Sequence, residues 1–189
     1  MSENPGDSRT IEKRRRILQA AWRLVLRQGL RGVTMEALAR EAGIAKGTLY
    51  AHFVDKDAVF GAVIDDMLIE LQAAFGDGMV GEGPVAERVG AALAAKYGLI
   101  ARALEGSAHA DEIVNEHYRF AARFEALDRR VEAEVAAALT QAGAPEATDL
   151  ARIVIAAANG VSRKITGAEA IDRAIRLVCR RLIEPDASA

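Results

Sequence analysis

Apolar residues recur along most of the chain at intervals of three and four, which is the spacing of one face of an α-helix. Near the N-terminus, Ile17, Ala20, Ala21 and Leu24 form such a stripe. Valine and isoleucine do not alternate with polar residues over any length, as they would in a half-buried strand. The pattern therefore predicts an all-α protein.

Glycine and proline divide this pattern into separate helices. The clearest break runs from Gly76 to Pro84, and a second one covers Gly106 to Ala110. The predicted helices span about residues 10–28, 36–42, 45–51, 55–75, 85–104, 111 or 116–141 with an interruption near 115, 148–165 and 168–183. We expect an N-terminal three-helix domain over residues 1–55 and a larger C-terminal helical domain over residues 56–189.

The second and third predicted helices lie on either side of a tight turn. Thr34 is a favourable N-cap for the first of them, and Gly43 can adopt the positive φ that the turn needs. Leu49 and Phe53 are expected in the core, where apolar residues of both helices pack together. This spacing is typical of a helix-turn-helix, whose second helix lies in the DNA major groove with its N-terminal residues at base edges.

The charge distribution favours DNA binding by the N-terminal part alone. The net charge of −2 hides an asymmetry, because residues 1–61 hold 11 Lys and Arg against 7 Asp and Glu, whereas residues 62–189 hold 14 against 20. We interpret the basic cluster from Lys13 to Arg16 as a solvated face with weak DNA steering rather than a specific site.

Several classes of protein and site are disfavoured. No apolar run approaches the about 20 residues of a membrane span and the N-terminus is polar, so we expect a cytoplasmic protein with no membrane contact. The single cysteine, Cys179, excludes an internal disulfide, and its apolar surroundings favour a buried thiol over a redox switch. Catalytic and phosphate-binding motifs are absent, and His109 and His117 do not share a helix face. We therefore expect no enzyme activity, cofactor or metal.

The sequence GIAKGTLYAHF from Gly43 to Phe53, followed by Lys56, resembles the signature of the TetR family of bacterial transcriptional regulators. The specific resemblance covers about residues 10–61. It implies a homodimer of nine or so helices per subunit, whose N-terminal domains bind a palindromic DNA operator. It also implies that the C-terminal domains form the dimer and enclose a small-molecule pocket, and that an effector bound there releases the DNA and relieves repression.

Four of the expected DNA contacts lie at the starts of the two motif helices. Thr34 caps its helix while its backbone N–H faces a phosphate. Lys46 carries a positive charge to a phosphate or a guanine edge, and Gly47 lets the backbone approach the DNA closely. Thr48 offers a hydroxyl and a methyl group to a base edge.

Three further contacts follow toward the next helix. Tyr50 and His52 resemble family residues that donate to phosphates, and Lys56 resembles another phosphate contact. The chain departs from the family pattern at Ala45, where serine is frequent, and at Ala51, where a larger residue is frequent. Both departures remove possible DNA contacts and make the operator sequence less predictable.

The last two helices, over about residues 148–183, have broad apolar faces for their length. Two such helices can pack against their own domain on one side and against a second subunit on the other, as a four-helix bundle. The alternative is that both faces pack the internal core.

Ligand sites in helical domains lie between helices, with apolar walls and a few polar groups. Asn159 lies in an apolar stretch, where burial would require a hydrogen-bond partner. Core packing is the alternative for every residue considered. The residues expected in an effector pocket are Tyr97, Ile100, Leu104, His117, Tyr118, Phe120, Phe124 and Asn159.

The predicted function is a ligand-responsive repressor. Three alternatives remain open: an activator of the same fold, a DNA-organising protein without sequence preference, and a helical enzyme or small-molecule carrier with a non-functional helix-turn-helix. The second would bind random DNA as well as any operator at fixed salt.

Overall fold

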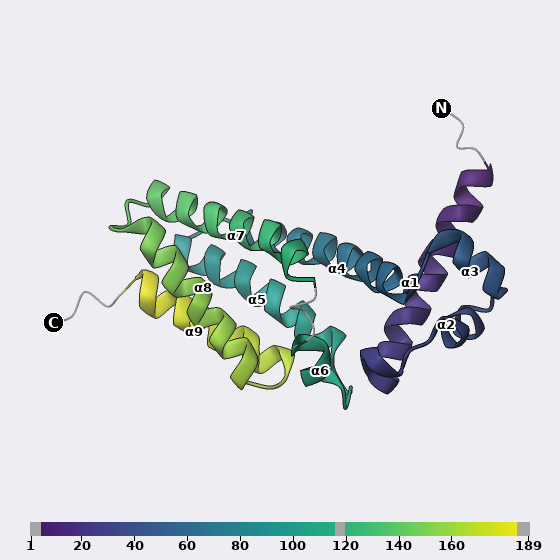
Figure 1. Ribbon diagram of the computed structural model, residues 1–189. Helices are drawn as coiled ribbons and strands as arrows, with labels where there is room; N and C mark the ends of the chain where they lie inside the picture. The colour runs from purple at the N-terminus through teal and green to yellow at the C-terminus, as the bar shows by residue number, and fades with distance from the viewer. Residues whose placement is uncertain (1–4, 116–119, 185–189) are drawn as a thin grey trace. The chain divides into compact units, whose positions relative to one another are not determined.

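The structure, a computed structural model, describes residues 5–115 and 120–184, and all regular secondary structure in those ranges is helical. The prediction of an all-α protein is confirmed. The helices are α1 (Pro5–Gly32), α2 (Met35–Ala42), α3 (Lys46–His52), α4 (Lys56–Met79), α5 (Val85–Ala103), α6 (Ala110–Asn115), α7 (Ala121–Gln141), α8 (Ala147–Lys164) and α9 (Ala168–Ile183), as labelled in Figure 1. None of these helices is long and apolar enough to span a bilayer.

The chain divides into two compact units, and neither is continuous in sequence. The first unit joins the residues up to Met67 with the segment from Gly106 to Ala121, and the second contains the remainder. The division falls within α4 rather than at the expected boundary between residues 55 and 56. The boundary at residue 55 between an N-terminal three-helix domain and a larger C-terminal domain therefore stays a prediction. It differs from the division into compact units.

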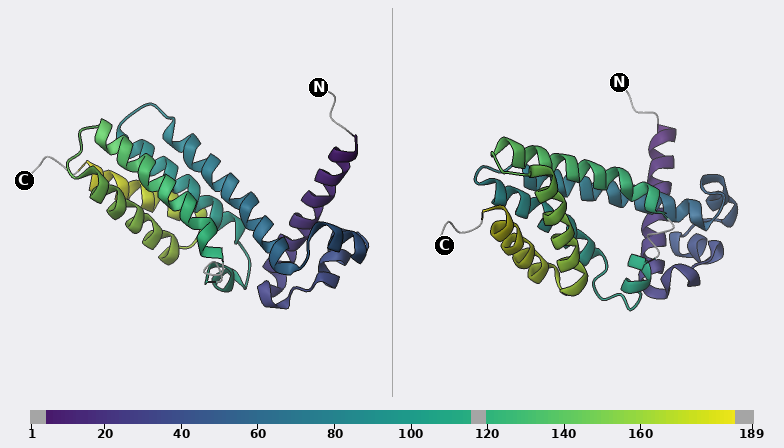
Figure 2. Two further views of the ribbon diagram at one scale, coloured as in Figure 1. Left: turned by 45° about the horizontal axis from the view of Figure 1, so that its top comes forward. Right: turned by 60° about the vertical axis from the view of Figure 1, so that its left-hand side comes forward.

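The first unit has its own hydrophobic core, built on the apolar stripe of α1. Ile17, Ala20 and Ala21 of that stripe are completely buried, as are Leu38 of α2 and Leu49 of α3. Figure 2 shows α2 and α3 lying beside α1 in both views. The side chains that the helix-turn-helix pattern placed in the core are thus the ones that hold the three helices together.

The regular part of α1 ends at Gly29, close to the predicted end near residue 28. Gly29 has φ +71° and ψ 167°, a conformation outside the helical region. The hydroxyl of Ser107, just before α6, donates to the carbonyl oxygen of Leu26 at 2.9 Å. A Cβ on Gly29 would collide with the carboxylate of Glu112 in α6. The absence of a side chain at Gly29 therefore leaves room for the side chain of Glu112 beside α1.

In the second unit α5 packs against α8 and α9, and the views in Figure 2 show these helices side by side. Gly90 of α5 lies where α9 approaches, so that a Cβ there would stand 3.4 Å from the Cβ of Cys179. Cys179 is completely buried, and burial raises the pKa of its thiol to about 11. The prediction of a buried thiol is confirmed.

The predicted break beginning at Gly76 is wrong in its first part, because α4 continues through Gly76 and Gly78 to Met79. A Cβ on Gly78 would collide with the backbone of Ala92 in α5. This glycine therefore allows close packing of two helices instead of ending one. The chain leaves the helical conformation only between Met79 and Val85.

Candidate nucleic-acid interface

Helix α2 begins with a side-chain cap. Thr34 has extended backbone angles, φ −119° and ψ 158°, and its hydroxyl oxygen accepts a hydrogen bond from the amide of Ala37 at 3.1 Å. The cap satisfies one of the free N–H groups of the first turn. Thr34 is exposed, so the start of α2 faces solvent. The prediction of Thr34 as an N-cap is confirmed.

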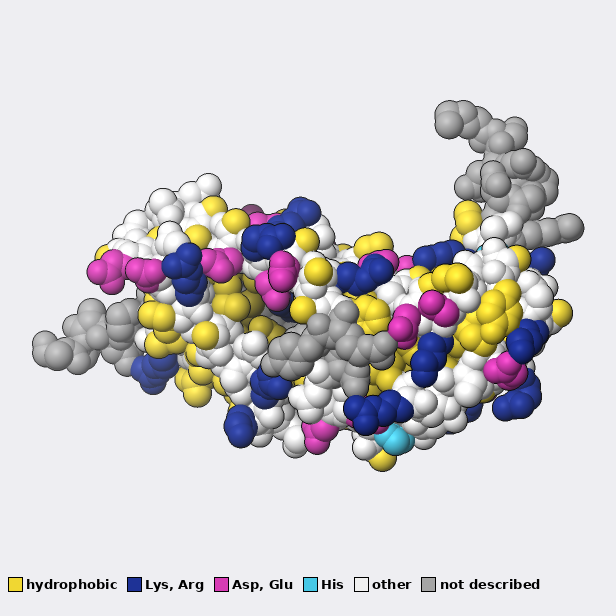
Figure 3. All heavy atoms as spheres, viewed as in Figure 1, with side chains coloured by type: hydrophobic (Ala, Val, Ile, Leu, Met, Phe, Trp, Pro, Cys, Tyr) yellow, Lys and Arg dark blue, Asp and Glu magenta, His cyan; other side chains and the backbone are white. Residues whose placement is uncertain are grey.

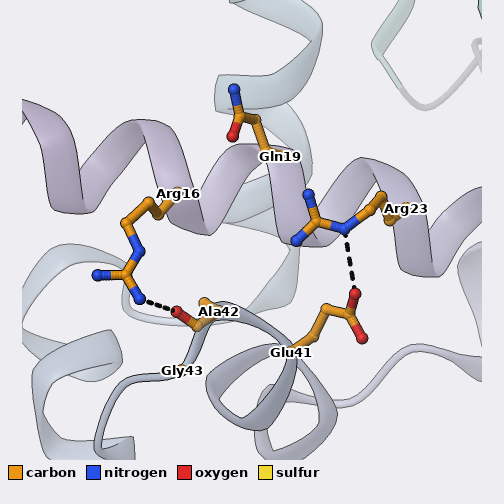
Figure 4. A pocket seen from close by; sticks show the side chains of 6 residues that line it. All are labelled: Arg16, Gln19, Arg23, Glu41, Ala42 and Gly43. Atoms are coloured by element: carbon orange, nitrogen blue, oxygen red, sulfur yellow. Dashed lines mark hydrogen bonds and ion pairs between the residues drawn. The ribbon is translucent and has the colours of Figure 1, made fainter.

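The turn between the motif helices is fixed by Gly43 and by arginines of α1. Gly43 has φ +65° and ψ 39°, and the amide of Ile44 donates to the carbonyl of Ala39 at 3.0 Å. Arg16 donates to the carbonyl oxygen of Ala42 at 2.9 Å. Figure 4 shows this side chain reaching from α1 to the end of α2. These contacts satisfy backbone groups that the end of α2 would otherwise leave free.

Glu41 adds ion pairs to the same contact. Arg23 lies 3.1 Å and Arg27 lies 2.6 Å from its carboxylate oxygens. Hydrogen bonds from Arg27 and then Arg23 hold the pKa of Glu41 below its usual value. Arg16, Arg23 and Glu41 are among the residues that line a groove of about 210 Å³, which is shown in Figure 4. We interpret this groove as the packing contact of α1 on α2, because Arg23 is paired with Glu41 and Arg16 donates to the carbonyl oxygen of Ala42.

The three arginines of the basic cluster in α1 also make contacts within the protein. Arg14 lies over the ring of Phe53 at 5.7 Å from the centroid, and Arg15 forms an ion pair with Glu12 at 3.1 Å. Arg16 supports the turn, as described above. The sequence predicted that this cluster is a solvated face. The contacts show that its arginines have a structural role as well.

Helix α3 buries one side and exposes the other. Leu49 is 0% exposed and Phe53 is 7% exposed, which confirms the prediction that both are core residues. Lys46, Gly47 and Tyr50 are exposed. Apart from Gly47 itself, its two neighbours and the nearby backbone of α3, no heavy atom of the described residues lies within 4 Å of the position that a Cβ on Gly47 would take. Packing within the described chain thus leaves this part of α3 accessible.

The remaining residues of the predicted interface lie on α3 and at the start of α4. Thr48 and His52 are half-buried on α3. Lys56 begins α4, and its ammonium donates to the carbonyl oxygen of Val33 at 3.4 Å. Val33 directly precedes the capping Thr34, so the starts of α2 and α4 are joined by this contact. All seven residues predicted to contact DNA therefore lie in the first unit.

Glu36 is a residue of this surface that the sequence analysis missed. Its carboxylate forms an ion pair with the ammonium of Lys46, which links the first turn of α2 to the first residue of α3. The hydrogen bond to Lys46 lowers the pKa of Glu36, and the same contact raises the pKa of Lys46. Lys46 also lies 5.8 Å from the ring centroid of Tyr50. The sequence signal was weak, because Glu36 and Lys46 are ten positions apart across a turn.

A cleft of about 290 Å³ in the second unit brings together two of the residues predicted for an effector pocket, Tyr97 and Asn159. Tyr97 is 8% exposed, and burial raises the pKa of its hydroxyl. Asn159 is exposed, which corrects the expectation that burial would force it to find a partner. The other residues that line the cleft are Asp128, Glu132, Arg152, Ile155 and Ala156.

The cleft is more polar than expected for an effector pocket. Arg152 donates to Glu132 at 2.8 Å, so two of the lining charges neutralise each other. Lys96 is 5% exposed and lies 3.2 Å from Asp128, its partner across the α5–α7 contact. An uncharged or zwitterionic ligand would suit such paired charges better than a purely apolar one.

The other residues predicted for the pocket are not among those that line the cleft. Ile100, Leu104 and Phe124 are half-buried. Phe120 packs against the hydrophobic core of the first unit. His117 and Tyr118 lie outside the described residues.

The paired helices α8 and α9 carry apolar residues on both sides. Val154 and Ile175 are completely buried, whereas Ile153 is 55% and Leu177 is 49% exposed. Apart from Gly160 itself, its two neighbours and the nearby backbone of α8, no heavy atom of the described residues comes within 4 Å of a Cβ placed on Gly160. Figure 3 shows hydrophobic side chains on the surface over α8 and α9, beside Lys and Arg side chains.

Comparison with known proteins finds sequence similarity in the N-terminal part. Residues 17–63 match the family model of bacterial regulatory proteins, tetR family. An HTH-type transcriptional regulator of Staphylococcus aureus is 41% identical over 58 residues, which cover 30% of this chain and 31% of that protein. The HTH-type transcriptional regulator AcrR of Shigella flexneri is 34% identical over 71 residues, which cover 34% of this chain and 33% of that protein. The chain thus matches about a third of the length of these curated relatives.

Similarity of fold extends much further along the chain. The crystal structure of a TetR transcription regulator from Haloarcula marismortui superposes with a TM-score of 0.73 and 16% sequence identity, over 92% of this chain and 97% of that one. At this sequence identity, the similarity establishes a shared fold only. The second unit therefore has helices of a known arrangement but a largely different sequence.

Proposed function

Because the chain belongs to the TetR family of bacterial transcriptional regulators, we propose that it binds a palindromic DNA operator as a homodimer and represses transcription until a small-molecule effector releases it. The observation that carries the proposal is the two-sided helix α3, whose core side is anchored by Leu49 while Lys46 and Tyr50 face solvent. A bacterial operator lies in the cytoplasm, so the proposal places the protein there.

The polar groups around α3 have the chemistry that duplex DNA requires. Lys46, Gly47 and Thr48 form the leading turn, which would enter the major groove and meet base edges. Contacts to phosphate fix the register of a protein on the duplex without reading its sequence. The residues proposed to make them are Thr34, Tyr50, His52 and Lys56.

The homodimer would form through α8 and α9. A monomer that exposes Ile153, Leu177 and Leu182 on neighbouring helices carries apolar surface that a second copy can cover. The open space at Gly160 supports close approach of a helix from the other subunit. Two-fold symmetry would then present two copies of α3 to half-sites separated by one or more helical turns.

The effector would bind in the second unit, at the cleft lined by Tyr97 and Asn159. Release of DNA needs only an effector that binds the DNA-incompetent conformation more tightly than the competent one. A difference of about 3 kcal/mol lowers operator affinity more than a hundredfold.

The test of DNA binding starts with selection of sites from random duplex DNA. Wild-type protein should enrich one palindrome, and the double substitution Tyr50→Ala/Lys56→Ala should abolish binding to it while circular dichroism and the oligomeric state stay unchanged. The matched control is Glu125→Ala/Arg129→Ala, which removes an exposed ion pair of α7 that the proposal gives no role.

Operator binding that survives the Tyr50→Ala/Lys56→Ala change would contradict the proposal. Enrichment of no sequence by the wild-type protein would favour a DNA-organising protein, or a helical small-molecule-binding protein or enzyme with a non-functional helix-turn-helix.

A further inference from the structure

The ion pair between Glu36 and Lys46 lies on the surface proposed to face DNA. Glu36 is in the first turn of α2 and Lys46 begins α3, the two helix starts that carry the proposed contacts. The side chains are 59% and 55% exposed, so both charged groups are accessible from solvent. Tyr50 lies one turn after Lys46, and its ring holds the ammonium on the exposed side of α3 at 5.8 Å.

A carboxylate at this position needs an explanation, because the polyanionic backbone of DNA repels it. Exposed ion pairs contribute little to folding stability, and the position of Glu36 in the first turn of α2 adds only a small stabilisation by the helix dipole. A carboxylate is, however, a suitable acceptor for the exocyclic amino group of cytosine in the major groove. The position of Glu36 therefore suits the reading of a base better than the binding of a phosphate.

We propose that Glu36 and Lys46 together read one G·C base pair in each half-site. Lys46 donates to O6 or N7 of the guanine, and Glu36 accepts from N4 of the cytosine. This proposal rests on the proposed operator binding and adds Glu36 to its sequence-reading residues.

The geometry of the base pair matches that of the ion pair. Guanine O6 and cytosine N4 are hydrogen-bonded to each other and thus lie about 2.9 Å apart. Lys46 and Glu36 are likewise in direct contact, so the ion pair can lie across the base pair without being broken. An A·T pair with adenine in the place of the guanine presents a donor at N6 and an acceptor at thymine O4, which reverses the pattern of O6 and N4, although adenine keeps the acceptor N7.

The ion pair also limits non-specific binding. While Lys46 is paired with Glu36, the carboxylate offsets the positive charge of the ammonium and repels a nearby phosphate, so most random sites gain little from this lysine. Substitution Glu36→Ala would free the ammonium for one additional phosphate contact. The slope of log K against log salt concentration should then become steeper by about 0.9.

The experiment compares wild type, Glu36→Ala, Lys46→Ala and the control Glu125→Ala. Glu125 is an exposed ion-paired carboxylate of α7, so its removal changes the net charge equally. Each protein selects sites from duplexes with a randomised centre of ~30 bp, about three helical turns. Wild type and control should share a G·C preference at one position per half-site, and both Glu36→Ala and Lys46→Ala should lose it while the rest of the palindrome remains.

Binding to defined duplexes, measured by fluorescence anisotropy, gives the magnitude. Replacement of the selected G·C by A·T should weaken wild-type binding about tenfold to hundredfold and Glu36→Ala binding much less. Replacement of guanine by inosine leaves the major-groove edge unchanged and should leave wild-type binding unchanged.

Two outcomes separate this proposal from the one on which it rests. If wild type and Glu36→Ala select the same palindrome with the same salt dependence, the reading by Glu36 is wrong while operator binding stands. If wild type selects no sequence, operator binding itself is wrong. A strong loss of wild-type affinity on inosine substitution would place the reading in the minor groove and overturn the proposed contacts.

Discussion

Leu49 and Tyr50 are neighbours in α3, yet Leu49 is 0% exposed whereas Tyr50 is 46% exposed. Leu49 anchors the helix to the core of the first unit, and Tyr50 is directed toward solvent, where the proposed DNA contacts lie.

Substitution of these two neighbours should separate stability from DNA binding. Leu49→Ala should lower the free energy of unfolding by ~2–5 kcal/mol, because it leaves a cavity in the core. Tyr50→Ala should change stability by less than about 0.5 kcal/mol and weaken operator binding. Urea unfolding and anisotropy on the selected operator measure the two effects. Equal loss of stability in both variants would show that Tyr50 has a structural role instead.

Two glycines should respond in opposite ways to alanine. Gly29→Ala should destabilise the first unit by about 1 kcal/mol or more, because its φ of +71° is unfavourable for alanine and the new Cβ meets Glu112. Gly47→Ala should stabilise α3 by about 0.5–1 kcal/mol, since the added methyl group meets no described atom and alanine is the better helix former. Thermal unfolding compares them, and Gly47→Ala should also weaken operator binding if the backbone approaches DNA there. A stabilising Gly29→Ala would contradict the described kink.

The cap of α2 should be worth a measurable free energy. Thr34→Ala removes the acceptor of the Ala37 amide and should cost about 1 kcal/mol, whereas Thr34→Ser should retain most of the stability. Chemical denaturation of both variants measures the difference. An alanine variant as stable as the serine variant would mean that water replaces the cap.

The proposed dimer predicts the effect of charge on α8 and α9. Ile153→Glu combined with Leu177→Glu should yield a monomer, because it places carboxylates within an apolar interface. Val80→Glu is the control, as Val80 is 83% exposed and lies in the α4–α5 loop. Light scattering after gel filtration determines the mass. A dimer that survives the double change would require a different interface.

The buried thiol predicts a pH dependence. The pKa of Cys179 is raised from its usual 9.0 to about 11 by burial, so the folded state holds its proton more tightly than the unfolded state. This contribution to stability is therefore complete below pH 9 and is lost as the pH rises toward 11. Native protein should react slowly with a thiol reagent at pH 8 and rapidly when unfolded. In Cys179→Ala, the part of the alkaline destabilisation due to this thiol should disappear. Rapid reaction of folded protein would contradict burial.

Local patterns in the sequence predicted most helices well. The range of α9, Ala168–Ile183, agrees with its predicted span, because an apolar repeat and a glycine before it define both ends. Helix α6 ends at Asn115, close to the interruption expected near that residue. These features are determined by residues close to one another in the sequence, so they can be predicted from the sequence.

Features that depend on contacts between helices could not be predicted. Gly78 looked like a helix break, but it lies at the crossing with Ala92 of α5. Asn159 looked buried within an apolar stretch, but that stretch exposes one side. Glu36 became part of the candidate interface only once the turn at Gly43 brought it to Lys46. In each case the missing information was the orientation of one helix relative to another.

The hydrogen bond from Ser107 to the carbonyl of Leu26 joins residues 81 positions apart, and Phe120 contributes to the same unit. During translation, α1 to α3 emerge from the ribosome long before this later segment does. The N-terminal unit therefore cannot reach its final packing until α5 and α6 have left the exit tunnel. A nascent chain stalled before residue 107 would carry the helix-turn-helix without the segment that covers the bend at Gly29.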